Sequence, residues 1–137
     1  MSLEENKAIA RRWNDELWSK GNVAAVDELM ATNFVWHTSF AGVAPDREGF
    51  KQSAAYLSSF SEMNCVAEDM VADGDKVAVR WTWSGKHTGE YMGMAPTGKQ
   101  VTMTGISIIH IAGGKIVEEW DEQDSMGFME QLGAKMG

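Results

Sequence analysis

Two tight turns, Asp73-Gly74 and Gly113-Gly114, constrain the fold of this chain more than any other feature. Each turn lies between two runs that are rich in β-branched or alternating apolar residues. The predicted strands on either side are Met63 to Val71, Lys76 to Trp83, Lys99 to Ile111 and Lys115 to Gln123. Because dipeptides of this kind join antiparallel neighbours, the second half of the chain is predicted to form a meander.

The first half of the chain has the apolar spacing of helices. Ser2 and Glu5 make a capping-box pattern, which predicts a helix from Leu3 to Lys20 that ends at Gly21. The other predicted elements are a short helix capped by Asn22, a strand at Phe34 to His37, a helix from Pro45-Asp46 to near Ser61, and a tail helix from Ser125 to Lys135. Helices followed by strands predict an α+β domain, in which helices cover one side of a curved antiparallel sheet and the curvature leaves a cavity.

Length and charge narrow the class of protein. With 137 residues and 44% apolar content, one domain over residues 1–137 is expected. No apolar run approaches the roughly 20 residues needed to cross a bilayer, and the segment Met1 to Glu5 does not resemble a secretion signal, so a cytoplasmic protein is expected.

The net charge is −8 and the twelve basic residues are scattered, which argues against nucleic acid as a partner. The single cysteine, Cys65, is expected to be a small buried hydrophobe.

Titratable side chains gather where the predicted strands end. His87 follows the second strand of the meander, in a connection rich in glycine, and His37 ends the strand near the N-terminus. Asp121 and Asp124 come at the end of the last strand. A carboxyl group held in a partly apolar pocket has a raised pKa, which suits proton transfer near neutral pH. These four residues are the catalytic candidates.

Each aspartate also has a purely structural interpretation. Asp124 precedes Ser125 and can be the N-cap of the tail helix, whereas Asp121 can be a solvated charge at the strand end. Strand parity puts Val117, Glu119 and Asp121 on one face, but it does not place Asp124, because the strand is ending there. The choice between the two aspartates stays open at this point.

The sequence has no motif for a nucleophile, a nucleotide cofactor or a metal. Gly-x-Ser-x-Gly, Gly-x-Gly-x-x-Gly and Walker-type loops are absent, and His37, His87 and His110 come from separate segments without metal-ligand spacing. We therefore expect acid/base chemistry without a cofactor or metal, or simple binding.

A set of motifs along nearly the whole chain points to a known family. The motifs are His87-Thr88-Gly89-Glu90, Gly93, Pro96 to Lys99, Gly105-Ile106-Ser107, Gly114 to Trp120 and Asp124, with a weaker part at Trp36-His37, Gly42 and the helix around Phe50. In these motifs the chain resembles the SnoaL-like polyketide cyclases, also called predicted ester cyclases. The resemblance implies the nuclear transport factor two-like cone, the fold of ketosteroid isomerase and scytalone dehydratase. It also implies a homodimer that pairs through the exposed face of the sheet.

Characterised members of this family close the last ring of an aromatic polyketide methyl ester by an intramolecular aldol condensation, with an Asp as acid/base and no metal. The resemblance implies this role for Asp124 or Asp121, with His87 and His37 lining the pocket or polarising a carbonyl of a small hydrophobic compound. The residues expected to contact that compound are Trp36, Trp81, Trp83, Tyr91, Met92 and Trp120. Because the fold also hosts isomerases, dehydratases and non-catalytic binders, those activities and a binding module remain the alternatives.

Overall fold

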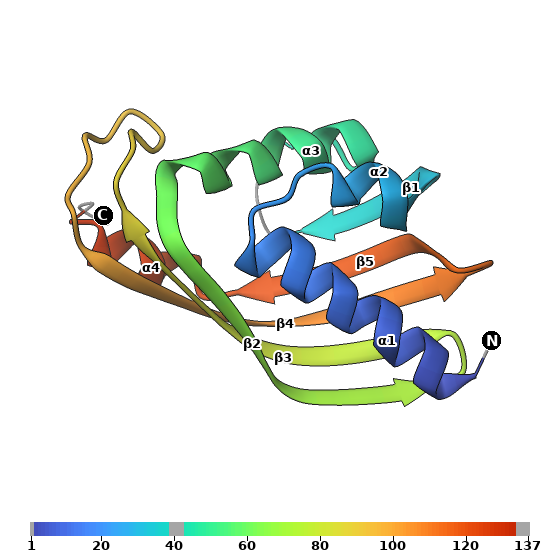
Figure 1. The fold of residues 1–137 in the computed structure, drawn as a ribbon. Helices are drawn as coiled ribbons and strands as arrows, with labels where there is room; N and C mark the ends of the chain where they lie inside the picture. Colours follow the sequence, from blue (N-terminus) through green and yellow to red (C-terminus); the bar gives the residue numbers. More distant parts are fainter. Residues whose placement is uncertain (1, 39–42, 134–137) are drawn as a thin grey trace.

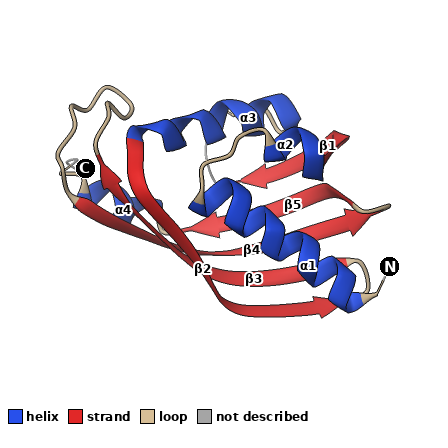
Figure 2. Ribbon diagram, viewed as in Figure 1, coloured by secondary structure: helices blue, strands red, loops and turns tan. Residues whose placement is uncertain are grey.

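The computed structural model describes residues 2–38 and 43–133. In chain order its elements are α1 (Leu3–Trp13), the π-helix η1 (Asn14–Ser19), α2 (Ala25–Leu29), β1 (Met30–Thr38), α3 (Arg47–Ala54), the 3-10 helix η2 (Ala55–Ser59), β2 (Phe60–Asp73), β3 (Lys76–His87), β4 (Gln100–Ala112), β5 (Lys115–Gln123) and α4 (Ser125–Gln131). The five strands form one sheet in the order β1-β5-β4-β3-β2. Helices α1, α2 and α3 lie over one face of this sheet, and α4 lies at one end of it (Figure 1, Figure 2).

The predicted N-terminal helix is confirmed, with one change in its second half. The hydroxyl of Ser2 accepts a hydrogen bond from the backbone of Glu5, whose carboxylate accepts one from the backbone of Ser2, both at 3.1 Å. After Trp13 the helix widens into η1, and it ends before Gly21, where φ is 69°. A π-helical segment is uncommon and often marks a functional site.

The two following helices differ in how well the sequence predicted their starts. Asp46 caps α3 as expected, because its carboxylate accepts a hydrogen bond from Gly49 N at 2.8 Å. Asn22 does not cap α2; Ala24 occupies the N-cap, and the amide of Asn22 instead donates to Glu16 at 3.3 Å. An N-cap would use the side-chain oxygen of Asn22 as an acceptor, whereas here its side-chain N–H₂ group donates to Glu16 of η1.

The meander is confirmed as antiparallel pairs β2–β3, β3–β4 and β4–β5. In the β4–β5 turn, Gly113 and Gly114 have φ of 58° and 78°, which is the geometry of a two-residue hairpin. One pairing in the sheet was not predicted, however. Strand β1 pairs with β5 in parallel, which the long stretch of chain between them permits.

Curvature is clearest in β2, a strand of 14 residues that bends toward its start next to η2 and stays paired with β3 at both ends (Figure 1). Its register with β3 shifts twice, between Ser61 and Asn64 and between Ala67 and Asp69, and such irregularities bend a strand. The core therefore lies between the concave face and helices α1 and α3. Within the described residues, no helix is long and apolar enough to cross a bilayer.

Candidate active site

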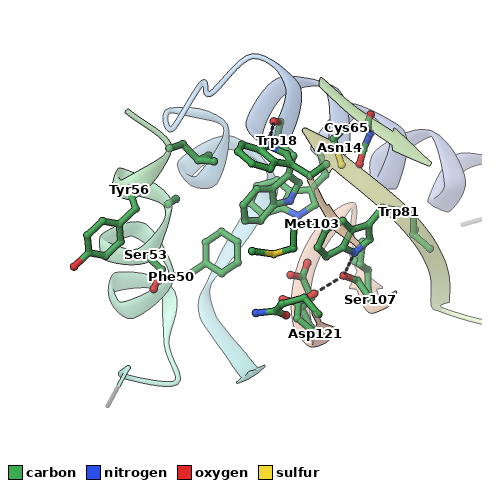
Figure 3. A pocket seen from close by; sticks show the side chains of 18 of the residues that line it. Asn14, Trp18, Phe50, Ser53, Tyr56, Cys65, Trp81, Met103, Ser107 and Asp121 are labelled. Carbon is green, nitrogen blue, oxygen red and sulfur yellow. Dashed lines mark hydrogen bonds between the residues drawn. The ribbon is translucent and has the colours of Figure 1, made fainter. Parts of the chain in front are cut away.

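A cavity of about 140 Å³ opens between the helices and the concave face of the sheet (Figure 3). It has room for roughly ten water molecules, because each needs about 10–15 Å³ measured in this way. Helix residues Phe50, Ser53 and Tyr56 lie across it from the strand residues Trp81 and Asp121. Ten of the 23 lining residues are aromatic: Trp13, Trp18, Trp36, Phe50, Tyr56, Phe60, Trp81, Trp83, Tyr91 and Phe128.

Asp121 brings a carboxylate into this largely apolar cavity. It is buried, and its Oδ2 accepts a hydrogen bond from Trp36 Nε1 at 2.7 Å. Its Oδ1 accepts one from the Ser107 hydroxyl, which in turn accepts from Trp81 Nε1 at 2.9 Å (Figure 3). Two donors from two neighbouring strands thus fix the orientation of the carboxylate.

The sheet geometry explains this arrangement. Alternation along β5 turns Glu119 and Asp121 to the concave side, and the parallel pairing of β1 places Trp36 opposite Glu119. Gly105 on β4 leaves the space that the Trp81 ring fills, because a Cβ at this glycine would lie 2.3 Å from the ring. The series of hydrogen bonds from Trp81 through Ser107 to Asp121 therefore depends on a glycine in the middle of a strand.

Glu119 lies two residues before Asp121 in the same wall. Its side chain is fully buried, with 1% of its surface exposed. Burial raises the pKa of Glu119 well above its usual value, and Asp121 raises it further through its negative charge and through a hydrogen-bonding contact between the two side chains. Trp13 lies close enough to lower this pKa slightly, although its N–H makes no hydrogen bond of normal geometry within the described residues. The wall thus pairs an acid whose protonated form is favoured with a hydrogen-bonded carboxylate.

Two other titratable groups of the wall stay neutral near pH 7. Burial, together with the charge of Asp15, raises the pKa of the Cys65 thiol to about 12. Burial also raises the pKa of the Tyr91 phenol, with a smaller effect from Tyr56. Cys65 is therefore not a thiolate nucleophile in the folded protein.

Asp124, His37 and Trp120, all predicted site residues, lie outside the cavity. Asp124 is exposed and caps α4, accepting a hydrogen bond from Gly127 N at 2.9 Å. His37 and Trp120 lie on the other face of the sheet, where their rings stack at 5.0 Å and the imidazole pairs with Glu118 at 2.7 Å. The alternation of side chains along a strand explains their position. His37 follows the cavity residue Trp36, and Trp120 precedes the cavity residue Asp121, so both point to the opposite face.

His87 also lies beside the cavity rather than in its wall. It ends β3 and is fully buried, with Nδ1 3.0 Å from the Thr97 hydroxyl and its ring 5.5 Å from Phe60. Strand β3 is longer than predicted. His87 still pairs with Phe60 of β2, and its backbone N–H donates a hydrogen bond to the carbonyl oxygen of Lys99. Among the other predicted contact residues, Trp36, Trp81, Trp83 and Tyr91 line the cavity.

Met92 does not line the cavity, since its side chain is 62% exposed. It lies in a tight turn with a φ of 47°, and this turn carries its side chain outward while Tyr91 faces the cavity. Within the described residues no three His, Cys, Asp or Glu side chains are grouped in a way that could hold a metal ion.

The sequence did not predict the polar wall residues Asn14, Ser53, Ser107, Glu119 and Gln123, and two of them, Glu119 and Ser107, interact with Asp121. The signal for Glu119 was present, because strand parity put it on the same face as Asp121. Ser107 lies on the inward side of β4, between the apolar positions Val101 and Ile109. A buried hydroxyl among apolar neighbours needs a hydrogen-bond partner, and this requirement could have identified Ser107 as a candidate site residue.

Comparison with known proteins decides the family. The sequence pattern of the SnoaL-like polyketide cyclases matches residues 8–132. The chain belongs to this family. A segment of 59 residues is 41% identical to aklanonic acid methyl ester cyclase AcmA of Streptomyces galilaeus, and it spans 43% of this chain and 41% of AcmA. The match thus covers less than half of either protein.

Solved structures agree with this family and with the fold. The structure of wild-type IdmH from Streptomyces antibioticus is 30% identical, covers 94% of this SnoaL-like chain and 99% of IdmH, and gives a TM-score of 0.78. TsrD from Streptomyces laurentii shares the fold, with 23% identity, 98% and 99% coverage, and a TM-score of 0.83. The nuclear transport factor two-like fold that the sequence resemblance implied is confirmed.

Proposed function

We propose that this SnoaL-like protein is an acid/base enzyme that closes a ring in a small hydrophobic carbonyl compound and needs no cofactor. The observation that carries the proposal is Asp121, a carboxylate held by Trp36 and Ser107 inside an aromatic cavity. Apolar pockets with a few convergent polar groups are the usual form of small-molecule sites. A carboxylate fixed in such a pocket is a suitable general base.

The proposed reaction begins when Asp121 takes a proton from the carbon next to a substrate carbonyl. The resulting enolate carbon attacks a second carbonyl of the same molecule, and a carbon–carbon bond forms. The new alkoxide then takes the proton back from Asp121, so the enzyme ends the cycle in its starting state. The proposal gives Asp124, His37 and His87 no direct part, because none of them lines the cavity.

The family and its relative support the substrate class. The name of AcmA says that it cyclises aklanonic acid methyl ester. The aromatic wall suits a flat substrate, because indole and phenyl rings stack on conjugated rings. The described wall contains no Lys, Arg or His, so a neutral ester fits it better than a free acid.

The test is cyclisation of aklanonic acid methyl ester, followed by chromatography, with the wild-type protein and with Asp121→Asn. The substitution keeps shape and removes the base, so turnover should fall by about 10²–10⁴-fold while the fold is retained. Glu122→Gln is the matched control, because Glu122 is exposed on the same strand and its loss should leave turnover unchanged.

A second assay does not depend on the true substrate. Asp121 should exchange the proton next to the carbonyl of 1-tetralone in heavy water, which NMR can follow, and Asp121→Asn should not. Tight binding of both compounds without turnover or exchange would instead identify a binding module. Full activity of Asp121→Asn would show that another residue is the base.

A further inference from the structure

Glu119 is a buried acid that the proposed reaction has not yet used. It lies in the cavity wall, and its Oε1 is buried without a hydrogen-bond partner among the described residues. Burying a carboxyl group without a partner destabilises a protein, so a group of this kind calls for an explanation. Leu or Met would fill the same space without that penalty.

The state of Glu119 follows from its surroundings. Burial and the adjacent charge of Asp121 both raise the pKa of Glu119 well above its usual value, which favours the protonated, neutral form of its carboxyl group. A neutral carboxyl group carries an O–H donor, which a carboxylate lacks. Glu119 and Asp121, two residues apart on one side of β5, thus offer a donor and a base in the same wall.

A second unpaired group lies beside it. Trp13 Nε1, also in the wall, has no hydrogen-bond partner within the described residues. Trp13 lies near enough to Glu119 to act on its carboxyl group. The two donors together form a polar group in a largely apolar wall, and an acceptor oxygen on the ligand would complement them.

We propose that Glu119 is a further catalytic residue, which donates a hydrogen bond from its neutral carboxyl group to the substrate carbonyl oxygen while Asp121 removes the neighbouring proton. The inference rests on the proposed function and deepens it. The C–H bond breaks, its proton goes to Asp121, and its electron pair becomes the enolate, whose oxygen carries the charge that Glu119 stabilises. Glu119 keeps its own proton throughout, so no further reactant is needed. A donor aimed at a developing oxyanion stabilises the transition state more than the ground state.

Glu119→Gln and Glu119→Met separate this role from packing. Gln has the same shape and a neutral N–H donor, whereas Met has a similar length and no donor. With aklanonic acid methyl ester, Glu119→Met should lower kcat by about 10²–10³-fold, the usual effect of losing one oxyanion donor. Glu119→Gln should stay within about tenfold of the wild type, because it keeps the donor. Glu119→Leu is a second donor-free variant in case Glu119→Met does not fold.

The direct readout is the infrared carbonyl band of ¹³C-labelled 1-tetralone bound to each protein, which reports hydrogen bonding to that oxygen. The band should lie at lower frequency in the wild type and Glu119→Gln than in Glu119→Met. A change in packing alone would not produce this pattern. An unchanged band in Glu119→Met, or no binding of 1-tetralone to the wild type, would overturn the proposal.

The two proposals fail in different ways. If Asp121→Asn loses turnover but Glu119→Met keeps it, the base is confirmed and Glu119 has only a packing role. If Asp121→Asn keeps turnover, the proposed function fails, while the carbonyl band still decides whether Glu119 is a donor. Glu122→Gln should leave the band unchanged.

Discussion

Trp36 Nε1 lies 2.7 Å from Oδ2 of Asp121, although 85 residues separate the two in sequence. The contact exists because β1 pairs with β5 in parallel, at the edge of an otherwise antiparallel sheet. Trp36 therefore has two roles in the cavity, as an aromatic wall and as the donor that orients the carboxylate. The two roles can be separated by substitution.

Trp36→Phe keeps an aromatic ring and removes the N–H. A hydrogen bond to a charged group is worth about 1.5–3 kcal/mol, so kcat for aklanonic acid methyl ester should fall about tenfold or more while KM changes little. Trp120→Phe is the control, because Trp120 lies on the other face of the sheet. Steady-state kinetics of both variants checks this, and an equal loss in both would contradict it.

Asp124→Ala tests the structural role of the other aspartate. Loss of an N-cap costs about 0.5–2 kcal/mol, so the free energy of unfolding in urea should fall by that amount. Asp124→Ser should restore most of it, because a hydroxyl can also accept the hydrogen bond from Gly127. Turnover should stay unchanged in both variants wherever they are folded. A folded but inactive Asp124→Ala would return the catalytic role to Asp124.

Glu119→Gln should change how stability depends on pH. The folded state holds the Glu119 proton more tightly than the unfolded chain, because burial raises its pKa well above 4.5. The stabilisation from Glu119 is therefore present at acid pH and is lost as pH rises toward the folded-state pKa, by at most about 1.4 kcal/mol per pH unit. Glu119→Gln cannot ionise, so its stability relative to the wild type should increase from pH 5 to pH 9 in thermal unfolding.

This comparison isolates Glu119 from other titrating groups. The histidines are present in both proteins, and the raised pKa values of Cys65 and Tyr91 keep those groups neutral over most of this range. Parallel stability curves for the two proteins would mean that Glu119 does not hold a proton in the folded state.

The expected homodimer remains a prediction, and the outer face of the sheet is where it can be tested. Ile106 and Ile108 on β4 are 53% and 40% exposed there. Ile106→Glu should convert a dimer to a monomer in sedimentation velocity, because a charge at an apolar interface is costly. Ser58→Glu, an exposed position on η2, should not. A monomeric wild-type protein would refute the expectation.

Local patterns in the sequence predicted most of the fold. The capping box at Ser2, the helix start at Pro45-Asp46 and the Gly113-Gly114 turn depend on residues within a few positions of one another, and each is confirmed. The parallel pairing of β1 with β5 was missed. The nine residues of β1 do not by themselves predict which strand it pairs with, because that choice depends on how the elements between β1 and β5 pack.

The site was predictable only in part, for the same reason. Alternation along β5 correctly put Glu119 and Asp121 on one face. It could not say which face bounds the cavity, and so His37 and Trp120 were taken as site residues although they lie on the opposite side. The hydrogen bonds from Trp36 and Ser107 to Asp121 join three strands, and no spacing in the sequence encodes them.

The parallel pairing of β1 with β5 also determines when the cavity can form during synthesis. On the ribosome, β1 emerges early, but its partner β5 follows only after three other strands have been made. Until then β1 is an unpaired edge, and a nascent chain has neither Asp121 nor the strand that orients Trp36 toward it. Because contacts this distant in sequence form slowly, the step that completes the sheet is also the one that assembles the site. Partly made chains therefore lack the complete cavity and expose a strand edge that other chains can pair with.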